Sequence, residues 1–85
     1  MPVNYRQAFS ELVEKERLVV SSKMEEIGPE HDRRYRFTWL INENASDTTW
    51  MQVSGDFATT KASARELASK EAFEFLEIRY RNENV

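Results

Sequence analysis

One stretch near the middle of the chain alternates between apolar and polar side chains over ten residues, from position 33 to position 42. A period of two predicts a strand with one buried face, because successive side chains of a strand point to opposite sides of the sheet. Such a strand needs a second layer of structure to cover its apolar face. The side chains expected on that face are Tyr35, Phe37, Trp39 and Ile41, and the opposite face is expected to hold Arg34, Arg36, Thr38 and Leu40.

Two segments with helical periodicity flank this strand and can supply the second layer. Apolar residues recur at spacings of three and four over residues 4–16 and again over residues 60–80. Residues 18–27 and 48–53 predict two further strands, separated from the central one by polar turn segments. The sequence therefore predicts an α+β fold in the order α-β-β-β-α, a three-stranded antiparallel sheet with two helices packed on one face.

Length and composition are those of a small single-domain protein. The 85 residues suffice for one core, which we expect within residues 1–80, with residues 81–85 as a frayed C-terminal tail. Cysteine is absent, so an intracellular, cytoplasmic location is expected, with the nucleus as the alternative. No apolar run approaches the ~20 residues of a membrane span, so no membrane contact is expected.

The sequence lacks the residue types that catalysis or metal binding would need. It has one histidine, no cysteine and no glycine-rich phosphate loop, which leaves no metal cluster and no nucleophile paired with a base. Glu25 and Glu26 are adjacent, so on a strand they point to opposite faces and cannot form an acid-base pair. We therefore expect a protein that is not an enzyme, with no catalytic residue, no metal, no cofactor and no small-molecule substrate.

The start of the second predicted helix carries two cations. Lys61 and Arg65 lie one turn apart on the same face, and the first acidic residue of the helix is Glu66. Positive charge at a helix N-terminus opposes the helix dipole, whereas it complements phosphate groups. The alternative is that both are surface residues with acidic neighbours at Glu66 and Asp56. Because the net charge is −3, phosphate binding requires that the basic residues cluster.

A turn and a second basic group lie between the first two predicted strands. The turn reads Gly-Pro-Glu-His at residues 28–31, and His31 is able to donate a hydrogen bond to a 2′-hydroxyl or a base edge. Arg33 and Arg34 follow and are candidates for phosphate contacts. A solvated strand edge is the simpler interpretation of both arginines.

Three motifs in order resemble the double-stranded RNA-binding domain family over residues 4–76. The first is Phe-Ser-Glu-Leu at residues 9–12, and the second is Gly-Pro-Glu-His at residues 28–31, followed by the aromatic Tyr35. The third is Thr-Lys-Ala-Ser-Ala-Arg at residues 60–65, continued by small and apolar residues as far as Leu76. The resemblance implies the α-β-β-β-α fold and double-stranded RNA as the partner.

The resemblance also implies a binding mode. The first helix would lie in one minor groove, the turn at residues 28–31 in the next, and the start of the second helix against phosphates across the major groove between them. Such domains span about 16 base pairs and read A-form shape and 2′-hydroxyls more than sequence. The RNA-binding residues implied are Gln7, Glu11, Pro29, His31, Lys61 and Arg65, with Arg33 and Arg34 as additional phosphate contacts.

Departures from the family pattern keep two alternatives open. Ala62 replaces a family lysine, and Asp56 stands where glycines are usual, so the resemblance implies weak RNA binding. In the first alternative, a degenerate domain of the same fold mediates protein–protein interaction or homodimerisation through Leu40 and Trp50 on the open sheet face. In the second, the chain is the RNA-targeting part of a larger RNA-processing enzyme.

Overall fold

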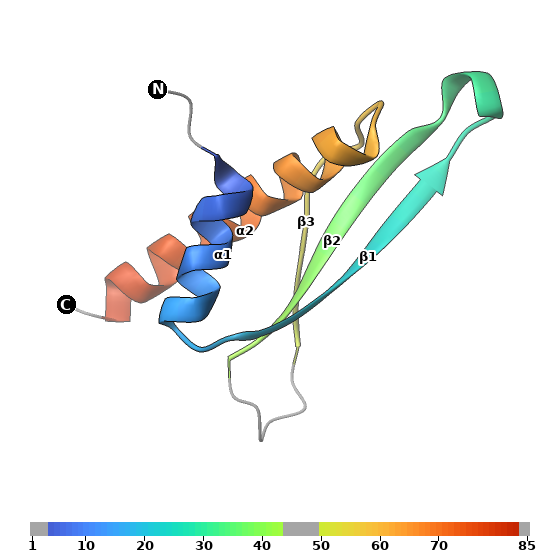
Figure 1. Cartoon of the computed structure of the whole chain (residues 1–85). Coiled ribbons are helices and arrows are strands. Elements are labelled where there is room, and N and C mark those ends of the chain that lie inside the picture. The colour runs from blue at the N-terminus through green and yellow to red at the C-terminus, as the bar shows by residue number, and fades with distance from the viewer. Residues whose placement is uncertain (1–3, 44–49, 84–85) are drawn as a thin grey trace.

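The computed structural model describes residues 4–43 and 50–83, and side chains as far as Tyr80. Its elements are α1 (Tyr5–Lys15), β1 (Val19–Ile27), a 3-10 turn (Glu30–Asp32), β2 (Arg34–Asn42), β3 (Met51–Ser54) and α2 (Lys61–Glu83). The strands form one antiparallel sheet in the order β1-β2-β3. Both helices pack on one face of this sheet, which confirms the predicted α-β-β-β-α fold (Figure 1).

Local hydrogen bonds define both ends of α1. The side chain of Asn4 accepts a hydrogen bond from the backbone N–H of Gln7 at 3.2 Å and so caps the first turn. At the other end Arg17 has a φ of 55°, and the N–H of Leu18 donates to the carbonyl oxygen of Val13 at 2.9 Å. This is a Schellman motif, in which glycine is the usual residue at the left-handed position. The turn directs the buried Leu18 into the core just before β1.

The register of the sheet separates its two faces as the alternation predicts. Trp39 on β2 pairs with Ser22 on β1 and with Val53 on β3. Its ring packs against Phe9 of α1, with 4.7 Å between the ring centroids, so this face is the one that the helices cover. Leu40 is the next residue along β2 and therefore faces away from the helices.

Small residues of α2 allow this helix to lie close to the sheet. Ala64, Ala68 and Ala72 are fully buried along one side of the helix. Gly55, just after β3, makes a close approach to the same side, because a Cβ at this position would lie 2.5 Å from the backbone nitrogen of Ala68. The buried core forms two clusters, one of Phe9, Leu18, Ile41, Ala72 and Leu76, and one of Phe37, Ala64 and Ala68.

Trp39 packs against both core clusters and is oriented by a polar contact. Its ring centroid lies 4.9 Å from that of Phe37, in addition to the contact with Phe9. The indole N–H donates to the hydroxyl oxygen of Ser69 at 3.2 Å, and that hydroxyl donates to the carbonyl oxygen of Arg65 at 2.8 Å. The buried hydroxyl of Ser69 thus has a partner both as donor and as acceptor, as a buried polar group requires.

The segment between β3 and α2 continues along β2 and decides where α2 begins. Tyr35 and Ala58 exchange two backbone hydrogen bonds of 2.8 Å, beyond the end of β3. Two residues later the hydroxyl of Thr60 accepts from the N–H of Ser63 at 3.0 Å and caps α2. The helix therefore starts beside the first residues of β2, near the loop end of the sheet (Figure 1).

Several element boundaries differ from those expected from the sequence, since Leu18 precedes β1 and Trp50 precedes β3. Arg33 precedes β2 instead of opening it, and β3 ends at Ser54 rather than at residue 53. The helix α2 continues to Glu83, three residues into the segment expected to fray, because residues 81–83 include no glycine or proline to end it. Residues 48–49 of the expected third strand and residues 84–85 lie outside the described residues.

None of the helices in the described part of the chain is long and apolar enough to span a membrane.

Candidate nucleic-acid interface

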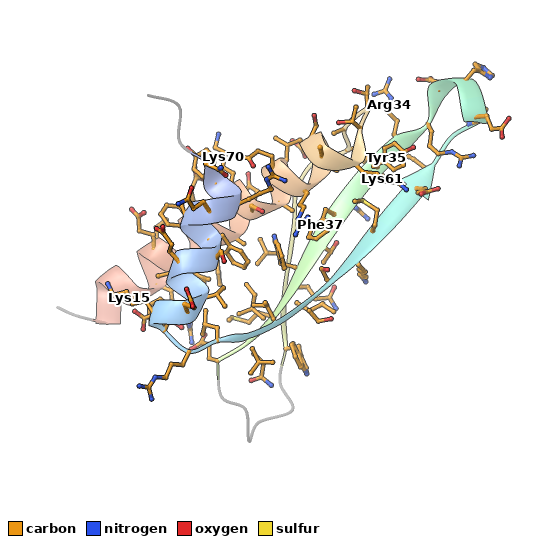
Figure 2. The ribbon with its side chains drawn as sticks, in the orientation of Figure 1. Lys15, Arg34, Tyr35, Phe37, Lys61 and Lys70 are labelled. Atoms are coloured by element: carbon orange, nitrogen blue, oxygen red, sulfur yellow. The ribbon has the colours of Figure 1, made fainter. Side chains whose placement is uncertain are left out.

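The first turns of α2 place Lys61 and Arg65 over two aromatic rings of β2. The ammonium nitrogen of Lys61 lies 5.8 Å from the ring centroid of Tyr35, and the guanidinium carbon of Arg65 lies 5.9 Å from that of Phe37. Four residues of helix rise by about 6 Å and two residues of strand by about 6.6 Å, so the two pairs match in spacing. Both cations therefore lie on the same side of α2, as Figure 2 shows for Lys61 beside Tyr35.

The acid that pairs with Lys61 comes from another element of the fold. The Lys61 ammonium lies 3.6 Å from Oε1 of Glu26 on β1. Glu66 instead binds the start of α1, where its Oε2 lies 3.4 Å from Nε of Arg6 and its Oε1 accepts from the N–H of Tyr5 at 3.0 Å. Glu66, one of the two acidic neighbours in the alternative interpretation, thus binds α1 and not Lys61.

Arg65 keeps an uncompensated charge. Within residues 4–43 and 50–80, no acidic side chain forms an ion pair with its guanidinium. Asp56, the other acid expected nearby, forms no ion pair with any residue of this part of the chain. Arg65 is therefore available to an external anion without first giving up a carboxylate partner.

Glycine and proline shape the loop that carries His31. Gly28 has a φ of 89°, and a Cβ there would lie 2.5 Å from the carbonyl oxygen of Asp32, so the loop has no room for a side chain at this position. The N–H of Asp32 donates to the carbonyl oxygen of Pro29 at 3.0 Å and closes a 3-10 turn. His31 lies within this turn, and its side chain is exposed to solvent.

The two arginines that follow the loop are both paired with acids. Nη1 of Arg33 lies 3.3 Å from Oε2 of Glu26, and Nε of Arg34 lies 3.6 Å from Oδ1 of Asp32. The side chains of both pairs are 38% to 64% exposed. Exposed ion pairs contribute about 0.2–1 kcal/mol each, so a phosphate group is able to replace either carboxylate.

α1 contributes two polar side chains on its outer surface. Gln7 and Glu11 are exposed, and the amide of Gln7 donates to Oε1 of Glu11 at 3.3 Å. In Figure 1 the start of α2 lies between α1 and the loop that joins β1 to β2. The structure thus brings the elements that carry the expected RNA-binding residues into the order α1, start of α2, loop.

Leu40 and Trp50 belong to the other face of the sheet. Leu40 pairs with Gln52 of β3, and alternation back from Gln52 places Trp50 on the same face. Trp50 is 42% exposed, as is Val19, which lies on this face of β1. These three side chains, Val19, Leu40 and Trp50, form what we call the open-face patch, which is separate from the basic residues of α2.

The chemistry of the surface that holds Lys61 and Arg65 is that of binding. It offers cations and exposed polar side chains, with the open-face patch on the opposite side of the sheet. Among the described residues there is no group of three or more histidine, aspartate or glutamate side chains that is able to hold a metal ion. Such a surface suits a polyanion more than a small neutral molecule.

Comparison with known proteins identifies the fold. No family model and no curated protein sequence matches the chain. The structure is similar to the solution structure of the second double-stranded RNA-binding domain of DRB4, with a TM-score of 0.53 and 22% sequence identity, over 94% of this chain and 99% of that one. The chain therefore belongs to the class of α+β domains with α-β-β-β-α topology. Within that class, it has the fold of a double-stranded RNA-binding domain.

Glu26 is the residue of this surface that sequence reasoning does not find. Its carboxylate contacts both Lys61 and Arg33, which belong to different parts of the chain. The only sequence signal is its position on β1, because alternation places it on the helix-covered face, opposite Tyr35. Proximity to α2 depends on the Tyr35–Ala58 bridge, which no residue pattern predicts.

Proposed function

We propose that this chain binds double-stranded RNA, without catalysis, by recognising A-form shape. The observation that supports the proposal most strongly is the position of Lys61 and Arg65 at the start of α2, between α1 and the loop (Figure 1). Domains of this fold contact two successive minor grooves and the phosphates of the major groove between them. The polar surface of α1 and the loop at residues 28–31 would match the two minor grooves, and the cationic start of α2 between them would match the phosphates of the major groove.

Each element has a separate task in the proposed complex. α1 lies in one minor groove, the loop lies in the next, and the start of α2 contacts phosphates between them. Positioning by phosphates and recognition of 2′-hydroxyls favour RNA over DNA, because B-form DNA lacks both the groove dimensions and the hydroxyls. The residues proposed to contact RNA are Gln7, Glu11, Pro29, His31, Lys61 and Arg65, with Arg33 and Arg34 as additional phosphate contacts.

Titration with two duplexes of about 20 base pairs, one RNA and one DNA, tests this proposal. We expect amide shifts in α1, at His31 and at Arg65 with the RNA duplex at low salt, and much smaller shifts with the DNA duplex. Raising the salt concentration should reduce the RNA affinity, because phosphate contacts release counterions. Equal shifts with both duplexes would contradict shape recognition, and no shifts with RNA would contradict RNA binding itself.

The open-face patch supports a second candidate function, in which the chain binds a second copy of itself. Trp50 and Val19 are each 42% exposed and lie beside Leu40, on the face that no helix covers. Aromatic residues on an exposed apolar patch are typical of protein interfaces. If this face mediates association, sedimentation should show a dimer that Trp50→Ala converts to a monomer, while RNA binding stays unchanged. A monomer at all concentrations would contradict this candidate.

A further inference from the structure

One carboxylate links two of the elements that the proposed RNA complex uses. Oε2 of Glu26 lies 3.3 Å from Nη1 of Arg33, at the end of the loop, and Oε1 lies 3.6 Å from the ammonium of Lys61, at the start of α2. The two oxygens thus serve two different cations. The side chain of Glu26 is 41% exposed, so it lies at the surface rather than in the core.

The position of Glu26 follows from the sheet. Glu26 is the residue of β1 that pairs with Tyr35 of β2, and the ring of Tyr35 also lies under Lys61. Lys61, Tyr35 and the adjacent Arg34 lie together at this end of the molecule in Figure 2. Because Arg33 binds the other oxygen of Glu26, the carboxylate is held beside the start of α2 even when Lys61 moves.

A carboxylate at this place affects any anion that approaches Lys61. The carboxylate forms an ion pair with the same ammonium that a phosphate group would contact, and two anions a few ångströms apart repel each other. The Debye length is about 8 Å at physiological ionic strength, so salt screens this repulsion only in part. Arg65, one turn further along α2, has no such competitor within the described residues.

We infer that Glu26 competes with RNA phosphate for Lys61 and so limits the affinity of the RNA-binding surface. The inference rests on the proposed function. Phosphate contacts Lys61 against the repulsion of Glu26, whereas no carboxylate among the described residues pairs with Arg65. Lys61 therefore contributes less RNA affinity to the wild-type protein than it would contribute if Glu26 were absent.

Glu25 provides a matched control for this inference. It is adjacent to Glu26 and is exposed to a similar degree, but it lies on the opposite face of β1, where its Oε1 binds Nη2 of Arg36 at 2.7 Å. Replacing either glutamate by glutamine changes the net charge by the same amount and keeps the shape of the side chain. Only Glu26→Gln removes a competitor of Lys61.

The experiment measures the affinity of each variant for a 20-base-pair RNA duplex at constant salt. We expect Glu26→Gln to bind about threefold to fivefold more tightly than wild type, since an exposed ion pair is lost, and Glu25→Gln to differ from wild type by less than about twofold. The gain from Glu26→Gln should shrink when Lys61 is already alanine, and it should disappear when both of its cation partners, Lys61 and Arg33, are alanine.

Four outcomes decide between the inference and the function on which it rests. A gain that is specific to Glu26→Gln and that depends on Lys61 supports both. Equal gains for the two glutamine variants would show a general effect of charge and would overturn the inference. Weaker binding by Glu26→Gln would also overturn it, because Glu26 would then position Lys61 and Arg33 for RNA. Absence of RNA binding in wild type and in every variant would overturn the proposed function.

Discussion

Replacing Lys61 and Arg65 together by alanine should remove most of the affinity for double-stranded RNA. Each phosphate contact contributes about 0.9 to the slope of log K against log salt, so two contacts contribute about 1.8. Between 1 M and 0.1 M salt these two contacts raise the affinity roughly sixtyfold, so at 0.1 M the double variant should lose roughly that factor. Fluorescence anisotropy with a labelled RNA duplex, at four or more salt concentrations, measures both the loss and the change of slope.

A second double variant serves as the control. Lys23 and Arg36 both lie on the open face of the sheet, where Lys23 pairs with Thr38 and Arg36 pairs with Glu25. Alanine at both positions removes the same charge from surfaces that the proposed complex does not use. We expect a smaller loss of affinity and an unchanged slope. Equal losses for the two double variants would contradict the assignment of the basic surface to α2.

Ile41→Ala should destabilise the fold by about 3–4 kcal/mol. Ile41 is fully buried in the larger core cluster, and removal of a buried aliphatic side chain costs the transfer free energy together with the cavity that remains. A domain of this size is stable by only about 5–10 kcal/mol, so this loss is a large fraction of the total. Urea denaturation followed by circular dichroism measures the change in the free energy of unfolding.

Leu40→Ala is the matched variant for this prediction. Leu40 precedes Ile41 on β2 and points to the open face, where it is half-buried. Its truncation removes fewer contacts, and we expect the free energy of unfolding to fall by about 1 kcal/mol. A larger loss for Leu40→Ala than for Ile41→Ala would mean that β2 is shifted by one residue, since a shift of one exchanges the two faces of a strand.

Most cations of the surface proposed to bind RNA are paired with acids. Lys61, Arg33 and Arg34 each have a carboxylate partner, whereas Arg65 has none among the described residues. Arg65 is thus the arginine of this surface that has no competing carboxylate among the described residues, in a chain with a net charge of −3. We expect the RNA affinity to be modest and to fall with increasing salt, because few contacts are made without exchange of a partner.

Particular elements show how much of the fold the sequence predicts. The alternation over residues 33–42 predicts β2 and the side chains that face the helices, although Thr38 on the other face is also buried, and the helical spacing predicts α1, whose cap at Asn4 is observed. The spacing of apolar residues predicts these elements because it depends only on the geometry of one helix or strand and on which of its sides faces the core. The end of α2 was expected too early, since nothing in residues 81–83 stops a helix. The roles assigned to the individual RNA-binding residues stay predictions.

Contacts between distant segments are the part that the sequence leaves open. The spacing of Lys61 and Arg65 predicts that they share a face of α2, but not which residues lie beneath them. Glu66 is a close neighbour of Lys61 in sequence, yet it binds α1, and the partner of Lys61 comes from β1. Which residues pair depends on how far a helix is rotated about its axis relative to the sheet. Tertiary packing sets this rotation, so the sequence spacing alone does not predict it.

The sequence by itself determined the order of elements, the face of each that is buried, and the two cations at the start of α2. These follow from local periodicity and capping, which depend on neighbours within a few residues. Only the tertiary structure decided that α2 starts beside the loop and that Glu26 lies against Lys61. Both depend on the bridge between Tyr35 and Ala58, whose formation requires the sheet, the helix and the core to be in place together.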